Sequence, residues 1–133
     1  MVFGTFDGLH PGHLNFFQQA RNLSANPFLI VSVARDRNVF KIKGMRPDYS
    51  ERQRLNLIKK HRLADRVVLA GLDRHLPHIL KEGPNIIALG YDQKKYVQNL
   101  RKDLKNSGLM VKVFRLKPYK PHLYKNHLLK KKS

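Results

Sequence analysis

Two histidines near the start of the chain have the type and the spacing to hold a phosphate group. His10 and His13 lie in the run GTFDGLHPGH, residues 4–13, three positions apart. On the first turn of a helix this spacing puts both rings on one side, where each imidazole can donate to a phosphate oxygen. The glycines let backbone approach closely, and a helix that begins near Pro11 offers unpaired N–H groups to an anion. The run therefore predicts a phosphate-binding loop that contains no lysine.

Two plainer interpretations of the histidine pair remain open at this stage. The rings could be surface side chains at a helix start, or they could supply half of a metal site. The sequence has no cysteine, and no nearby Asp or Glu stands at a spacing that would complete a ligand set. The pattern therefore favours phosphate over metal.

Length and composition limit the kind of protein that carries this loop. The chain has 133 residues, of which 41% are hydrophobic and 27% charged, values typical of one globular domain. Its longest apolar stretch, residues 28–34, is far shorter than the ~20 residues of a membrane-spanning helix. The absence of cysteine excludes disulfides, and no basic-then-apolar leader precedes the motif, so we expect a cytoplasmic protein with no membrane span.

The charge of the chain is unusual. There are 27 Lys plus Arg against 9 Asp plus Glu, a net charge of +18, which implies an anionic partner. Charge alone does not separate nucleic acid, an acidic membrane and a small phosphate compound, and much of a basic surface is simply solvated. The excess is densest at the end, where residues 115–133 hold seven basic side chains and no acidic one.

Short apolar runs alternate with amphipathic segments along the chain. Residues 28–34 are typical of a strand buried on both faces, and Ser50 with Gln53 forms a capping box ahead of a helix. The alternation predicts an α/β fold, a doubly wound five-stranded parallel sheet with helices on both faces. The expected strands cover residues 1–3, 28–34, 67–70, 85–89 and 109–114; the expected helices cover 11–23, 50–62, 73–83 (capped by Asp73) and 93–108.

The expected site follows from this topology. Ligands of such sheets lie beyond the carboxyl ends of the strands, at the point where the strand order reverses. The segments that reach this edge are expected to be loops: residues 4–13, 35–46, 71–74 and 90–93, and the chain after Phe114.

The run GTFDGLHPGH matches the GTFDxxHxGH signature of the cytidylyltransferase-like nucleotidyltransferases, and the chain resembles that family to about Phe114. The resemblance implies a Rossmann-like nucleotidyltransferase domain over residues 1–115. It implies transfer of a nucleoside monophosphate from a nucleoside triphosphate to a phosphorylated acceptor, with release of pyrophosphate and with Mg²⁺ as the companion ion. The segment 90–93, GYDQ, is more similar to archaeal-type FAD synthases, which favours ATP and FMN. Cytidylyl transfer from CTP to a small phosphorylated alcohol, such as glycerol-3-phosphate, is the alternative.

The resemblance also implies roles for particular residues. His10 and His13 would contact the reacting phosphates, Lys41 the triphosphate or the acceptor, and Arg54 the leaving pyrophosphate. For Arg54 the alternatives are that Arg52 takes the role or that both are solvated side chains on a helix. No protein metal site is expected, since Mg²⁺ would be held by the nucleotide phosphates and at most by Asp7 through water. The nucleotide-binding candidates are Gly4, Thr5, Phe6, Asp7, Gly12, Gly90, Asp92, Gln93, Arg115, Lys125 and Asn126.

The C-terminal segment departs from the family pattern. Family members place a Ser/Thr-rich turn there, whereas residues 120–129 contain neither residue, so Lys125 and Asn126 are the candidates for its role. We expect residues 116–133 to form a short basic helix that packs on or extends the domain. A different class of function also remains open, in which a catalytically decayed member binds nucleotides or nucleic acid through this basic segment. A homodimer is a further expectation.

Overall fold

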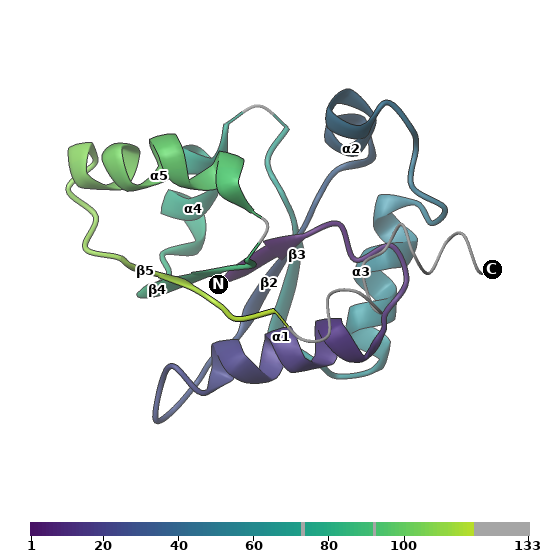
Figure 1. Ribbon diagram of the computed structural model, residues 1–133, viewed down its shortest axis with the longest axis horizontal. Helices are drawn as coiled ribbons and strands as arrows, with labels where there is room; N and C mark the ends of the chain where they lie inside the picture. Colours follow the sequence, from purple (N-terminus) through teal and green to yellow (C-terminus); the bar gives the residue numbers. More distant parts are fainter. Residues whose placement is uncertain (73, 92, 119–133) are drawn as a thin grey trace.

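The computed structural model describes residues 1–72, 74–91 and 93–118, and its fold is built on a parallel sheet (Figure 1). The five strands run in the order β3-β2-β1-β4-β5, and every neighbouring pair is parallel. The predicted doubly wound sheet is therefore confirmed. Its strands are β1 (Val2–Gly4), β2 (Ile30–Val33), β3 (Arg66–Leu69), β4 (Ile86–Leu89) and β5 (Lys112–Arg115).

Helices connect successive strands and cover both faces of the sheet. Residues on successive positions of a strand point to opposite faces, so Val2 and Phe3 enter different apolar clusters. The first cluster packs against α1 and α3, and the second packs against α4 and α5 (Figure 1). The helices described are α1 (Pro11–Arg21), α2 (Asp36–Lys43), α3 (Glu51–Lys60), α4 (His75–Glu82) and α5 (Lys94–Asn106).

The ends of these helices follow the expected local chemistry. Ser50 Oγ accepts from the N–H of Gln53, and Gln53 Oε1 accepts from the N–H of Ser50, which confirms the capping box of α3. Gly83 ends α4 in the left-handed region, as its position predicted. Asp73, the expected cap of α4, lies outside the described residues, and Arg74 holds the N-cap position.

The segment 35–46 was expected to be a loop, and this expectation was wrong. It contains α2, which ends at Gly44 with φ +72° and a hydrogen bond from Gly44 N–H to Phe40 O of 2.7 Å. The helix was not predicted because it is only eight residues long and buries only Val39. Its first turn is held from outside, since the N–H of Asp36 donates to Glu51 Oε1 at 3.0 Å.

The chain after β5 lies along α1. Leu116 is buried in the first cluster, and the Gln19 side chain exchanges two hydrogen bonds with the backbone of Lys117. Residues 119–133, where a short basic helix was expected, lie outside the described residues.

Candidate active site

The loops after β1 and β4 meet where the strand order reverses. β1 is hydrogen-bonded to both β2 and β4, so the chain leaves the sheet in opposite directions on either side of it. The Gln93 side chain joins the two loops: its Nε2 donates to Phe3 O at 2.8 Å, and its Oε1 accepts from Gly90 N–H at 2.7 Å. Gln93 therefore holds the backbone that leads into the motif next to Gly90 at this edge of the sheet.

The two histidines of the motif cap α1 together. His10 Nδ1 accepts from the N–H of Gly12 at 3.0 Å, and His13 Nδ1 accepts from the N–H of His10 at 3.3 Å. The two rings stack with their centroids 3.8 Å apart and their planes 25° apart. This is the geometry of a capping box in which imidazoles replace the usual hydroxyl and carboxyl groups.

This cap fixes the tautomer that each ring adopts when it is neutral. A nitrogen that accepts from an N–H carries no proton, so each neutral imidazole has its hydrogen on Nε2. Burial, and secondarily the charge that His10 would carry, lowers the pKa of His13 to about 3. At neutral pH the His13 ring is therefore neutral with an Nε2–H donor, and it stacks on the His10 ring at the start of α1.

The backbone of the motif is shaped by Phe6. This residue adopts φ +53°, which an ordinary side chain rarely tolerates, and its ring is buried at 3% exposure between His13 and Phe17. A Cβ on Gly4 would lie 2.6 Å from Phe6 Cζ, so the ring occupies the space that glycine leaves. The Phe6 ring lies under the histidine pair and meets the His13 ring edge to face with a centroid distance of 5.4 Å.

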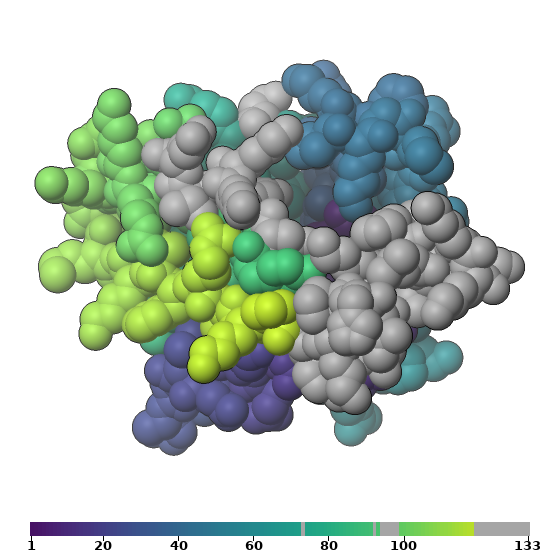
Figure 2. Space-filling model, in the orientation of Figure 1, coloured from purple at the N-terminus to yellow at the C-terminus, as the bar shows by residue number. Residues whose placement is uncertain are grey.

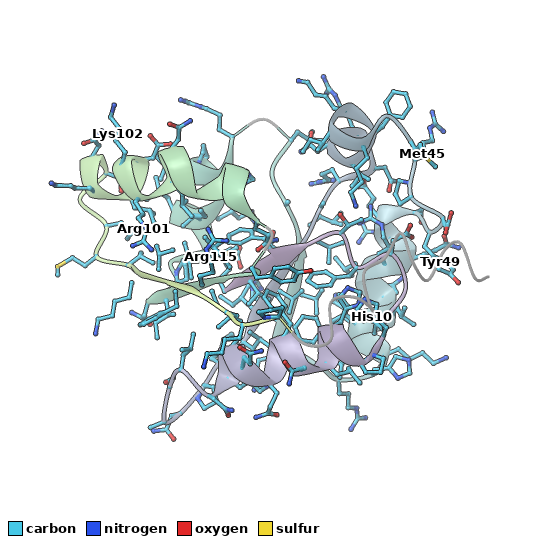
Figure 3. The ribbon with its side chains drawn as sticks, viewed as in Figure 1. His10, Met45, Tyr49, Arg101, Lys102 and Arg115 are labelled. Atoms are coloured by element: carbon cyan, nitrogen blue, oxygen red, sulfur yellow. The ribbon has the colours of Figure 1, made fainter. Side chains whose placement is uncertain are left out.

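Asp7 ties the motif to the segment that precedes α3. Its Oδ2 accepts from the N–H of Asp48 at 2.8 Å, and its Oδ1 accepts from the N–H of Tyr49 at 2.9 Å. These two bonds give Asp7 a role in ordering the motif loop. Figure 3 shows His10 and Tyr49 on the same side of the molecule.

Arg54 is fully buried and joins three segments of the site. Its Nη1 donates to Thr5 O at 2.8 Å and its Nε to Tyr49 O at 3.0 Å, while its Nη2 pairs with Asp36 Oδ1 at 2.6 Å. The interpretation of Arg54 as a solvated helix-face arginine was wrong. Arg52, the alternative candidate, is exposed on the same helix. The partners of Arg54 give it a positioning role for the motif loop and the start of α2.

Lys41 lies in the last turn of α2, with an exposed side chain. Asp36 and Arg54 hold this helix beside the motif loop. Figure 2 shows α2 and the residues after it as an outer lobe at the upper right of the molecule. The lysine therefore stands on a separate element from the histidines.

Segment 90–93 is braced by β5. Arg115 Nη1 donates to Gly90 O and to Tyr91 O, each at 3.1 Å, and the Gln93 N–H donates to Gly90 O at 3.1 Å. These bonds hold the loop in which the base-contacting residues were expected. The remaining candidates, Asp92, Lys125 and Asn126, lie outside the described residues.

Metal-ligand clusters and membrane-spanning helices are both absent from the part of the chain that the structure describes. Within residues 1–72, 74–91 and 93–118, no three His, Asp or Glu side chains gather in a geometry that could hold a metal ion. Over the same residues, no helix is long and apolar enough to span a bilayer. The expectation of unpaired N–H groups at the start of α1 was wrong, because the N–H of Gly12 donates to His10 Nδ1 and that of His13 donates to His10 O. The donors of the motif that suit an anion are therefore its imidazole N–H groups.

Sequence reasoning missed residues whose partners are distant along the chain. Asp36 and Glu51 hold the first turn of α2 in place, and Ser32 Oγ bonds His78 Nε2 at 2.8 Å between β2 and α4. A polar residue in the apolar run 28–34 was the one available signal for the Ser32 pair. Nothing local to Asp36 indicates its pairing with Arg54, 18 positions later.

Comparisons with known proteins agree with this site. The profile of the Cytidylyltransferase-like family matches residues 1–130, so the chain belongs to that family. An FAD synthase of Korarchaeum cryptofilum is 42% identical over 117 residues, which cover 87% of this chain and 79% of the relative. An FAD synthase of Methanosarcina barkeri is 43% identical over 117 residues, covering 87% and 81%.

A solved structure shows the same fold. The crystal structure of the lipopolysaccharide core biosynthesis protein from Thermoplasma volcanium GSS1 superposes with a TM-score of 0.80 at 34% identity, and the match covers 90% of this chain and 95% of that one. Family membership confirms the resemblance carried by the motif and identifies a nucleotidyltransferase.

Proposed function

We propose that this protein transfers the adenylyl group of ATP to FMN, forming FAD and pyrophosphate. The observation that carries the proposal is the stacked His10–His13 pair, which caps the start of α1 where the strand order reverses. The relatives named FAD synthase, 42% and 43% identical, support ATP and FMN over CTP and a phosphorylated alcohol.

The reaction needs positioning and charge stabilisation more than acid–base chemistry. A phosphate oxygen of FMN attacks the α-phosphorus of ATP, a new P–O bond forms, and the bond to the β-phosphate oxygen breaks in line. FMN phosphate is already anionic at neutral pH, so the step requires no general base. The imidazole N–H donors and the positive end of the α1 dipole would stabilise the charge that develops on the α-phosphate.

Other residues of the site take supporting roles in this proposal. Lys41 would neutralise the triphosphate or the acceptor phosphate. Arg54 and Asp7 would hold the motif loop in its reactive shape through the bonds described above. Arg115 and Gln93 would brace the loop around the base. Of the candidates outside the described residues, Asp92 would read the base edge, while Lys125 and Asn126 would contact the triphosphate.

Mg²⁺ enters this proposal only with the nucleotide. Both oxygens of Asp7 accept backbone N–H groups, and the described residues hold no three-ligand cluster, so they fit Mg²⁺ as a companion of the phosphates and not as a resident ion. When bound there it would neutralise phosphate charge. The cytoplasm is the setting we propose, where ATP and FMN are available.

The test is a product assay with two nucleotides and two acceptors. ATP or CTP is combined with FMN or glycerol-3-phosphate, pyrophosphate release is followed, and FAD is identified by chromatography. Of the four combinations, we expect only ATP with FMN to give product. His13→Ala should lower turnover by ~10²–10³-fold, the usual loss for one preorganised donor, while the far-ultraviolet circular dichroism stays that of a folded chain. Product from CTP and glycerol-3-phosphate alone, or full activity in His13→Ala, would contradict the proposal.

A further inference from the structure

An exposed apolar surface adjoins the motif on the outer side of α2. Phe40 is 53% exposed, Met45 is 69% exposed and Tyr49 is 49% exposed, values far above those of core residues. Figure 3 shows Met45 and Tyr49 along the same outer edge of the molecule. We call these three residues the α2 surface. Large exposed apolar side chains that gather in one place commonly mark a binding site.

The end of α2 favours a close approach of Phe40 and Met45. Gly44 adopts φ +72° and its N–H donates to Phe40 O at 2.7 Å. A left-handed residue at this position turns the chain back, and the next residue then commonly packs over the last turn of the helix. Met45 is that next residue, so an aromatic ring and a flexible thioether lie at the same turn.

The α2 surface is joined to the reactive loop by Tyr49. The N–H of Tyr49 donates to Asp7 Oδ1 at 2.9 Å, so its backbone is fixed to the motif. A Cβ on Gly8 would lie 3.9 Å from Tyr49 Cε2, which brings the ring to the backbone of that loop. A ligand on this surface would thus reach from α2 to the loop that holds the phosphates.

Charge indicates what occupies the surface. Residues 37–49 contain four basic side chains, Arg37, Lys41, Lys43 and Arg46, against one carboxylate, Asp48, and all five are exposed. A second copy of the chain placed here would bring two such cationic segments together, which like charges oppose. An anionic compound with a flat apolar ring satisfies both the cations and the apolar side chains.

We propose that the α2 surface binds the ring system of the acceptor, so that the acceptor is a phosphate monoester with a large flat heterocycle. This inference rests on the proposed function and identifies the flavin ring of FMN as the group that Phe40, Met45 and Tyr49 contact. The cations beside them attract the phosphate, and the ring contacts select FMN against small phosphorylated alcohols.

The test measures flavin binding directly. FMN and riboflavin fluoresce under visible excitation, which protein side chains do not absorb, so their fluorescence anisotropy can be followed in the presence of the chain. The variant is Phe40→Ser with Met45→Ser. Its matched control is Phe28→Ser with Met110→Ser, which removes the same residue types at 66% and 93% exposure. Thermal melts test whether both double variants fold. If Phe40→Ser with Met45→Ser does not fold, the single variant Met45→Ser takes its place.

We expect the α2 variant to bind FMN and riboflavin about tenfold more weakly, as loss of central apolar contacts usually does, with ATP affinity unchanged and the control variant like the wild type. Unchanged flavin affinity in the α2 variant would overturn the inference. Two other outcomes with unchanged flavin affinity would also overturn the inference. If the α2 substitutions dissociate a dimer, the surface binds a second copy of the chain. If they abolish binding to anionic vesicles, the surface binds a membrane.

Riboflavin separates this inference from the proposed function, because it carries the ring without the phosphate. If no FAD forms but riboflavin binds and its affinity falls in the α2 variant, the proposed function fails and the ring site stands. If FAD forms and the α2 variant keeps its Michaelis constant for FMN, the ring site fails and the proposed function stands.

Discussion

Replacing Arg54 with methionine tests how the motif loop is held. The guanidinium is fully buried and bonds Thr5 O, Tyr49 O and Asp36. Removing one partner of a buried ion pair costs ~3–5 kcal/mol. Asp36 remains 37% exposed and regains water, so we expect the lower end, about 3 kcal/mol. At this chain length that is a fall of roughly 10 °C in melting temperature.

Urea denaturation and thermal melts measure this loss of stability, and two further variants serve as comparisons. Arg52→Met changes an exposed residue two positions away on α3 and should stay within ~0.5 kcal/mol of the wild type. Arg54→Lys keeps the charge but cannot reach three acceptors at once, so its stability should lie between those of Arg54→Met and Arg52→Met. Loss of turnover in Arg54→Met with an unchanged melting temperature would refute the positioning role. It would instead support direct contact between the guanidinium and the leaving pyrophosphate.

Three further outcomes follow from the geometry. Gly4→Ala should destabilise the fold by ~1–3 kcal/mol in urea, because its Cβ would lie 2.6 Å from Phe6 Cζ in a packed core. Acid should also destabilise the fold, because His13 binds a proton below pH 6.5 in the unfolded chain, whereas in the folded chain its pKa is about 3. The free energy of unfolding should therefore fall from pH 6.5 towards pH 3, by ~1–2 kcal/mol at pH 5. Ser32→Ala should cost ~1–2 kcal/mol, since it leaves His78 Nε2 without its 2.8 Å partner.

Each of these outcomes has its own check. His13→Gln should flatten part of the loss between pH 7 and pH 5, and a slope identical to that of the wild type would count against the His13 explanation. Ser24→Ala, at an exposed serine, is the control for Ser32→Ala and should be nearly neutral. A Gly4→Ala protein as stable as the wild type would show that the Phe6 ring moves aside without cost.

Alternation of apolar and amphipathic segments was sufficient to predict the sheet and four of the five described helices. Those elements bury side chains such as Phe17, Ile58 and Ile79, whose spacing is visible in the sequence. Helix α2 was not predictable in this way, because it buries Val39 alone and is held by Glu51 and Arg54 of α3. Tertiary bonds, which leave no local pattern, stabilise it.

The candidate site was predictable where its chemistry lies within one run of sequence. The histidine pair and the helix start follow from residues 4–13, although their mutual capping does not, because it depends on ring rotamers. The partners of Asp7 are backbone groups 41 and 42 positions away, and backbone groups carry no sequence signal. The same limit hid the burial of Arg54.

The imidazole cap of α1 has an electrostatic consequence. The aligned peptide dipoles of a helix leave a partial positive charge at its first turn, and an Asp cap or a Glu in that turn would compensate it permanently. The first turn of α1 contains no acidic residue, and neither of its two capping side chains is a carboxylate. The backbone of the first turn is thus capped, but the positive end of the helix dipole is not compensated by a negative side chain. That positive end can therefore stabilise a bound anion.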